Sequence, residues 1–196
     1  MLLKELRAAF DGNEPRLMLT AAVSAGKATI DKAYNVPEMN RYMDLINVMS
    51  YDFHGWWPNH TYTGLNSPLY AMPEEQDPEH PGHNMNTDWA IKHWISQGAS
   101  PSKLLLGMAA YGRGFRLANP HNHGLYNPAV GPIDPAMYTS APGFWGYNEY
   151  CEKMKTEYNE WTLYRVSKSD LKYRIDIIVV NDEQAVVSLF FRTRMP

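Results

Sequence analysis

Cysteine is nearly absent from this sequence of 196 residues, whose single cysteine is Cys151. One cysteine cannot form an internal disulfide, and it cannot build a zinc site by itself. We therefore expect Cys151 to be either a small buried apolar residue or half of a disulfide whose partner lies outside this chain. An apolar core must then stabilise the fold, and the chain is long enough to form one.

Long apolar runs are missing as well. No stretch reaches the roughly 20 residues that cross a bilayer, so we expect no membrane partner. Residues 1–15 lack the continuous apolar core of a signal peptide, because Lys4 and Glu5 interrupt them. Leu2, Leu6 and Phe10 instead fit one face of a short amphipathic helix.

Neither sign of charge dominates, because the formal net charge is −3 and acidic and basic residues are interspersed. The sequence has no basic stripe, so we expect no nucleic-acid partner. The seven histidines include two close pairs, His80 with His83 and His121 with His123. No cysteine accompanies these pairs and both lie in predicted loops, so we expect neither a metal site nor a cofactor.

Apolar runs flanked by turn residues predict three buried strands, at 16–23, 45–51 and 103–111. The clearest helix lies before the third strand, with Asn86 or Thr87 as its N-cap and Gly98 as its stop. Continuous apolar strands separated by helices favour an α/β fold with a parallel sheet. The order of elements fits an open doubly wound sheet as well as a barrel.

The pattern changes in the second half of the chain. Residues 113–146 are rich in glycine, proline, asparagine and aromatic residues and are predicted to be loop-like. A helix is predicted at 147–158 and a strand at 161–166. Residues 171–196 predict two strands joined at Asn181-Asp182-Glu183. This mixture indicates an inserted segment of α+β character.

Aromatic and charged residues gather at the ends of the second and third predicted strands. Because parallel strands end at one edge of a sheet, we expect these side chains to converge. Flat aromatic faces beside hydrogen-bonding groups suit a sugar ring. The alternative is that the tyrosines and tryptophans are core residues. The candidate set is Met49, Tyr51, Asp52, Trp57, Tyr111 and Arg113.

Four segments carry a likeness to a known family. They are "LMLTAAVSAG", "MSYDFHGWW", "LLLGMAAYGRGF" and "PGFWGYNEYC". The first three resemble the fifth, sixth and seventh barrel strands of glycoside hydrolase family 18, which contains chitinases and chitinase-like lectins. The fourth is similar to the start of that family's insertion domain.

The resemblance implies a division of the chain into three parts. Residues 1–112 would be part of a (β/α)8 TIM barrel, without the barrel's first four strands. Residues 113–164 would begin the α+β insertion domain. Residues 165–196 do not resemble the family, so we expect a divergent tail there.

The resemblance also implies roles for the candidate residues and an extracellular location. The pocket for the sugar at the cleavage point would be lined by Met49, Tyr51 and Asp52. Trp57 matches an aromatic residue that stacks on a sugar beyond the cleaved bond. Tyr111 and Arg113 match residues that contact chitin, so the implied partner is chitin or an oligomer of N-acetylglucosamine.

The family's general acid ends an Asp-x-x-Asp-x-Asp-x-Glu motif, and this chain does not contain that motif. In this family the substrate's own N-acetyl oxygen acts as the nucleophile, unlike the usual pair of carboxylates. No catalytic residue is assigned here, and we expect no chitin hydrolysis by this chain alone. Three hypotheses stay open: a chitinase polypeptide, a non-catalytic chitin-binding lectin and a non-functional fragment.

The one N-glycosylation sequon, Asn59-His60-Thr61, lies in a predicted loop.

Overall fold

The computed structural model describes residues 2–122, 124–156, 161–166, 175–180 and 184–188. They belong to two compact units with separate cores. The first unit comprises Met1–Tyr51 and Pro68–Met108, and the second comprises Asp52–Ser67 and Ala109–Pro196.

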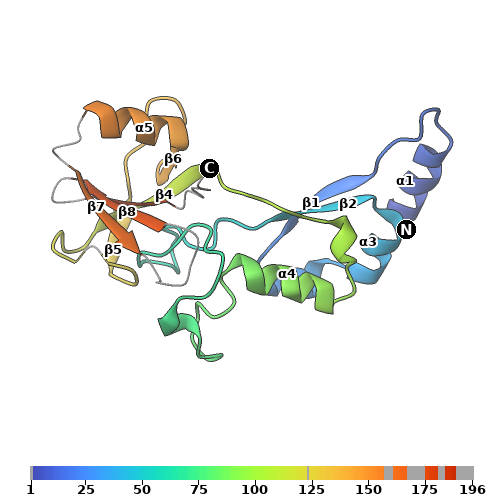
Figure 1. The fold of residues 1–196 in the computed structure, drawn as a ribbon, viewed down its shortest axis with the longest axis horizontal. Coiled ribbons are helices and arrows are strands. Elements are labelled where there is room, and N and C mark those ends of the chain that lie inside the picture. The colour runs from blue at the N-terminus through green and yellow to red at the C-terminus, as the bar shows by residue number, and fades with distance from the viewer. Residues whose placement is uncertain (1, 123, 157–160, 167–174, 181–183, 189–196) are drawn as a thin grey trace, which may run out of the picture. The chain divides into compact units, whose positions relative to one another are not determined.

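The first unit is built on a three-stranded parallel sheet in the order β1-β2-β3, of which Figure 1 labels β1 and β2. Its strands are β1 (Thr20–Ser24), β2 (Leu45–Met49) and β3 (Leu104–Leu106). Val23 lies opposite Val48, and Val48 lies opposite Leu106. The predicted α/β arrangement of parallel strands is therefore confirmed.

The first unit also contains the α-helices α1 (Leu2–Asp11), α2 (Lys27–Ala33), α3 (Val36–Tyr42) and α4 (Thr87–Ser96). The predicted limits of α4 are confirmed. Asn86 caps it by accepting a hydrogen bond from the Trp89 amide at 2.9 Å. Gly98 follows at a φ of 109°, a conformation that glycine adopts without strain. Among the helices that the structure describes, none is long and apolar enough to cross a bilayer.

One face of the parallel sheet forms the core of the first unit. Val23, Ile46 and Val48 are each at most 1% exposed. Trp94 of α4 is also fully buried, and its indole N–H donates to the carbonyl of Ser24 at 3.0 Å. The strand residues between these positions point to the opposite face, where Leu105 is 46% exposed.

Asp44 links α1 to the start of β2. Its carboxylate accepts hydrogen bonds from Arg7 at 2.8 Å, from Arg16 at 2.9 Å and from the Leu19 amide at 2.7 Å. The hydrogen bond from the Leu19 amide lowers the pKa of Asp44, and burial raises it. Arg16 and Arg7 lower the pKa further, so the net shift is downward. Asp44 therefore stabilises the folded state only while it is ionised.

We expect the first unit to lose stability in acid through this carboxylate. A lowered folded-state pKa gives stability that is present above the unfolded pKa of about 3.9 and is lost as the pH falls through the folded pKa. The urea midpoint should fall between pH 6 and pH 3, and it should fall less in Asp44→Asn, which cannot titrate. Equal falls in both proteins would show that Asp44 is not a source of the acid sensitivity.

The second unit is built on a six-stranded sheet in the order β5-β4-β9-β8-β7, with β6 pairing to β4. All of its pairings are antiparallel. Its elements are β4 (Tyr111–Leu117), β5 (Ala129–Pro132), β6 (Phe144–Gly146), α5 (Tyr147–Thr156), β7 (Trp161–Val166), β8 (Ile175–Val180) and β9 (Gln184–Ser188). The predicted helix, the strand at 161–166 and the pair of C-terminal strands are confirmed. The predicted turn Asn181-Asp182-Glu183 lies outside the described residues.

The structure corrects four of the predicted elements. The strand predicted at 45–51 ends at Met49. The strand predicted at 16–23 begins only at Thr20. The strand predicted at 103–111 ends at Leu106, because the continuous apolar run gives no signal where the chain leaves one sheet for another. Residues 113–146 contain most of β4 and all of β5 and β6 instead of a loop. Strands of three or four residues are too short to show an alternating pattern.

Candidate functional site

Asp52 is the centre of a polar cluster in the second unit. Its Oδ1 accepts a hydrogen bond from the Tyr111 hydroxyl at 2.5 Å and another from Nε of Arg113 at 2.8 Å. Burial lowers the pKa of Arg113, but the hydrogen bond and the charge of Asp52 raise it more, so the net shift is upward. The guanidinium therefore stays charged beside the carboxylate.

Three aromatic rings surround this guanidinium. The carbon Cζ of Arg113 lies 5.7 Å from the ring centroid of Trp57 and 5.6 Å from that of Phe144. Tyr111 is 5.6 Å away and stacks on Phe144 at a centroid distance of 4.4 Å. Such cation–π contacts hold a cation over the faces of the rings. We call Asp52, Trp57, Tyr111, Arg113 and Phe144 the Asp52 cluster.

The Asp52 cluster is accessible to solvent within its unit. Trp57 is 36% exposed, and the side chain of Asp52 is 38% exposed. A core position would bury the indole and would not place a carboxylate beside it. The alternative that the tyrosines and tryptophans are core residues is therefore wrong for Trp57.

A buried amide fixes the backbone around Asp52. Asn66 is fully buried, and its Oδ1 accepts a hydrogen bond from the Asp52 amide at 2.9 Å. Its Nδ2 donates to the carbonyl of Tyr111 at 3.0 Å, which joins both sides of the cluster. These bonds hold Asp52 at a φ of 61°, in the left-handed region that aspartate tolerates better than most residues.

Trp57 stands at one end of a tight turn. Its amide and carbonyl form hydrogen bonds with those of His60, at 3.2 and 2.8 Å. A Cβ atom on Gly55 would lie only 2.6 Å from the indole, so glycine is needed for the ring to pack on this backbone. The His60 ring lies 5.8 Å from the indole, and burial lowers the pKa of His60. This histidine is therefore neutral at pH 7.

Tyr111 and Arg113 belong to a different strand from the predicted one. They do not end a parallel strand beside β2 but begin the antiparallel strand β4 of the second unit. Residues two apart on a strand share a face, which explains why both side chains reach Asp52. Phe144 lies opposite Arg113 on β6. Sequence patterns missed Phe144 and Asn66, because neither an isolated ring nor an isolated buried amide has a periodic signal.

Met49 and Tyr51 lie in the first unit, at the end of β2. Met49 is 37% exposed, whereas Ser50 is fully buried and its hydroxyl donates to the carbonyl of Gly107 at 2.8 Å. Met49 and Ser50 therefore point to opposite sides at the end of β2. A Cβ on Gly107 would lie 2.9 Å from the Tyr51 ring, so that ring packs closely on the Gly107 backbone.

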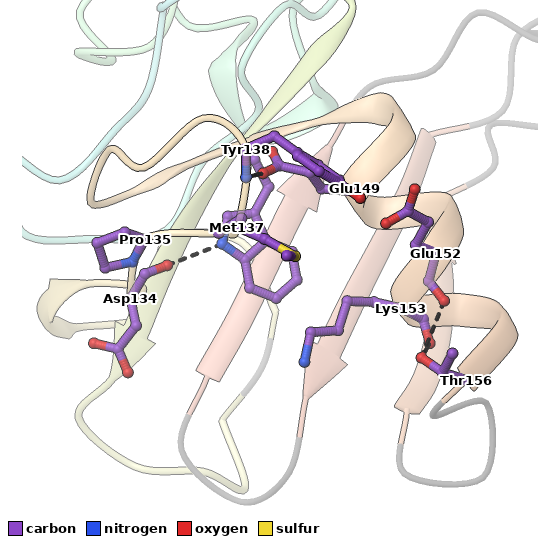
Figure 2. Close-up of a pocket in the computed structure, with 10 residues that line it drawn as sticks. Asp134, Pro135, Met137, Tyr138, Glu149, Glu152, Lys153 and Thr156 are labelled. Atoms are coloured by element: carbon purple, nitrogen blue, oxygen red, sulfur yellow. Dashed lines mark hydrogen bonds between the residues drawn. The ribbon is translucent and has the colours of Figure 1, made fainter.

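A pocket of about 640 Å³ lies beside α5 (Figure 2). Glu149 at its wall is 4% exposed and accepts hydrogen bonds from the amides of Tyr138 at 2.6 Å, Thr139 at 2.9 Å and Gly146 at 2.7 Å. The Thr139 hydroxyl donates as well, at 2.8 Å. Burial raises the pKa of Glu149, but these bonds lower it more. Glu149 therefore anchors the chain and has little capacity left for a ligand.

The rings of the first histidine pair, His80 and His83, form local hydrogen bonds. Nδ1 of His80 accepts from the Gly82 amide at 3.0 Å, and Nδ1 of His83 lies 3.1 Å from the carbonyl of Glu75. In the part of the chain that the structure describes, no group of three or more His, Cys, Asp and Glu residues could hold a metal ion. His123 lies outside that part. Cys151 is half-buried on α5 and its thiol is free.

Comparison with known proteins places this geometry in a family. The model of the glycosyl hydrolases family 18 matches residues 1–190. The oviduct-specific glycoprotein of Sus scrofa is 42% identical over 165 residues, which are 82% of this chain. The group IV chitinase of Ostrinia furnacalis, solved in complex with allosamidin, is 34% identical over 96% of this chain with a TM-score of 0.85.

A second solved structure is that of human YKL-39, described as a pseudo-chitinase with retained chitooligosaccharide binding. It is 32% identical over 95% of this chain, with a TM-score of 0.81. The chain spans 29% of the oviduct-specific glycoprotein and 48–49% of the two solved chains. The family match includes most of residues 165–196, for which the sequence patterns predicted no likeness. By this match and by its identity to these relatives, the chain belongs to the glycosyl hydrolases family 18.

Proposed function

We propose that this chain binds oligomers of N-acetylglucosamine through the Asp52 cluster and does not cleave them by itself. The observation that carries the proposal is the pairing of Asp52 with Tyr111 and Arg113 beside the exposed ring of Trp57. The apolar face of a pyranose ring stacks on an indole, while nearby polar groups fix its orientation.

The polar groups of the cluster suit an amide-bearing sugar. Both hydrogen bonds to Asp52 use Oδ1, and among the described residues Oδ2 accepts none. That oxygen is the acceptor for a hydroxyl or N-acetyl N–H of the ligand. Human YKL-39 supports this reading, because it is described as retaining chitooligosaccharide binding without being a chitinase. Met49 and Tyr51 of the first unit are proposed, from the family resemblance alone, to contact N-acetylglucosamine as well.

A second candidate function is a share in chitin hydrolysis. The family match and the likeness to the Ostrinia furnacalis chitinase favour it. The general acid would then have to come from residues outside this sequence, which has no Asp-x-x-Asp-x-Asp-x-Glu motif. Hydrolysis is therefore proposed only for a longer protein that contains this chain.

We further propose that residues 1–112 are part of a (β/α)8 barrel and that residues 113–164 are the start of an α+β insertion domain. The parallel order β1-β2-β3 supports the barrel, because barrel strands follow one another in this way. The other face of the sheet also supports the barrel. Met49 and Leu105 are exposed on that face, and in a closed barrel such apolar side chains pack in the interior. The divergence of residues 165–196 from the family stays a prediction.

An extracellular location is proposed as well. The relative that is 42% identical carries the word glycoprotein in its name. Asparagine-linked glycans are added to proteins of the secretory pathway, at exposed sequons.

Chitotriose should bind this chain in the millimolar range, and cellotriose should not bind measurably. A dissociation constant of about 1 mM corresponds to about −4 kcal/mol, which is what an open, partly ordered site provides. Cellotriose keeps the ring faces and lacks the N-acetyl groups, so it isolates their contribution. Saturation-transfer NMR on both ligands measures this. Equal signals from both sugars would show that the site does not recognise N-acetyl groups.

A further inference from the structure

The turn that carries Trp57 also contains the only N-glycosylation sequon of the sequence, Asn59-His60-Thr61. Trp57 and His60 are paired as an isolated antiparallel bridge, so Pro58 and Asn59 form the corner between them. Proline fits the first corner position of such a turn, and asparagine is favoured at turn positions. Asn59 and Thr61 are both exposed.

We propose that Asn59 is an N-glycosylation site and that its glycan covers the Asp52 cluster. In the covalent step, Nδ2 of Asn59 loses a proton and bonds to C1 of the first N-acetylglucosamine. The bond between that carbon and the pyrophosphate of a lipid-linked oligosaccharide donor breaks. The lipid pyrophosphate is the leaving group, and nothing is oxidised or reduced.

The chemistry of the glycan makes it a ligand for this site. The two sugars next to the asparagine of an N-glycan are β-1,4-linked N-acetylglucosamines, the repeating unit of chitin. This inference rests on the proposed function, because the site is proposed to bind that unit. The glycan would thus be an internal copy of the ligand, attached to the chain itself.

The position of Asn59 allows the glycan to reach the site. Asn59 follows Trp57 by two residues, which span at most about 7 Å of chain. Trp57 is 36% exposed, and its ring already lies against Arg113 of the Asp52 cluster. A short tether gives an attached ligand an effective concentration in the millimolar range. That matches the millimolar affinity expected for the free oligomer, so the attached sugars would occupy a substantial fraction of the sites.

The experiment compares the full chain made with and without its glycan. One preparation is secreted from a eukaryotic host behind a cleavable secretion signal, and the other is made in bacteria. Mass spectrometry of proteolytic peptides identifies the glycan on Asn59. Thr61→Ala removes the sequon, and Thr61→Ser is the matched control that keeps it.

We expect the secreted protein and secreted Thr61→Ser to carry the glycan and to bind chitotriose at least about twofold more weakly than the bacterial protein. Secreted Thr61→Ala should bind as tightly as the bacterial protein. Absence of a glycan on Asn59 in the secreted protein would overturn the modification site. A glycosylated protein that binds as tightly as the bacterial one would overturn the covering of the site.

A second readout separates this inference from the proposed function. The indole N–H resonance of Trp57 should shift between the bacterial and the glycosylated protein, without any added sugar. If the bacterial protein fails to bind chitotriose, the proposed function is wrong, and the Trp57 resonance still decides whether the glycan lies on this ring. An unchanged resonance on a protein that carries the glycan refutes the contact.

Discussion

Trp57→Ala should weaken chitotriose binding about tenfold, which corresponds to about 1.4 kcal/mol. The indole supplies the largest exposed apolar face of the Asp52 cluster, and its ring borders the guanidinium of Arg113 at 5.7 Å. The substitution removes both the stacking surface and one of the rings around that cation. A chemical-shift titration of the unglycosylated protein measures the affinity.

The matched control for this variant is Tyr70→Ala. Tyr70 is an exposed aromatic residue outside the Asp52 cluster, with 46% of its surface accessible. Its loss should leave the affinity unchanged. If Tyr70→Ala weakens binding as much as Trp57→Ala does, the contribution of Trp57 is not specific and the assigned site is wrong.

Asp52→Asn should weaken binding less than Trp57→Ala, by about threefold. Asparagine keeps the shape of the side chain and tolerates the φ of 61° that Asp52 adopts, so the backbone is preserved. It removes the negative charge that holds Arg113 and Tyr111. This variant thus tests the charge together with one acceptor oxygen of the carboxylate, whereas Asp52→Ala would add backbone strain to the measured effect.

Glu149→Gln should destabilise the second unit by about 3 kcal/mol, the largest stability effect that the structure leads us to expect. The buried carboxylate accepts hydrogen bonds from the amides of Tyr138, Thr139 and Gly146. A glutamine cannot satisfy all of these donors, because its NH₂ group does not accept. Gly146 belongs to β6, which pairs with Tyr111, so the variant should also weaken chitotriose binding.

Urea unfolding measures this prediction, with Glu152→Gln as the control on the same helix. The side chain of Glu152 is exposed, so its substitution should leave the urea midpoint nearly unchanged. The midpoint of Glu149→Gln should fall by about 1–3 M, given typical urea slopes. Equal midpoints for the two variants would contradict the anchoring role of Glu149. A wild-type chain without a cooperative transition would instead support the hypothesis of a non-functional fragment.

The sequence was most informative where an element has both a periodic pattern and a terminal signal. Helix α4 was predicted with its cap and stop, because Asn86 and Gly98 act through local backbone chemistry. Strand β2 was predicted from its apolar run, and Asp52 was assigned from its position just after that strand. These features depend on residues close in the chain, so the sequence alone contains them.

The missed features depend on contacts between distant residues. No sequence pattern indicated that Asn66 positions Asp52, because its partners Asp52 and Tyr111 are 14 and 45 residues away along the chain. The Glu149 carboxylate accepts a hydrogen bond from the Gly146 amide, as in a capping box. The usual sequence signature has Ser or Thr at the N-cap, and here the N-cap is glycine. Tyr111 was expected beside Asp52 and does contact it, but from β4 and not from the predicted parallel strand, because an apolar run does not reveal a change of sheet.

The measurement that tests the central claim most directly is the mapping of amide and indole shifts on the unglycosylated chain during a chitotriose titration. The account predicts that the largest shifts belong to Asp52, Trp57 and Arg113, at ligand concentrations above about 1 mM. It also predicts that residues around Glu149 and the pocket beside α5 do not shift. Shifts confined to that pocket or to residues 165–196, with none at the Asp52 cluster, would contradict the account.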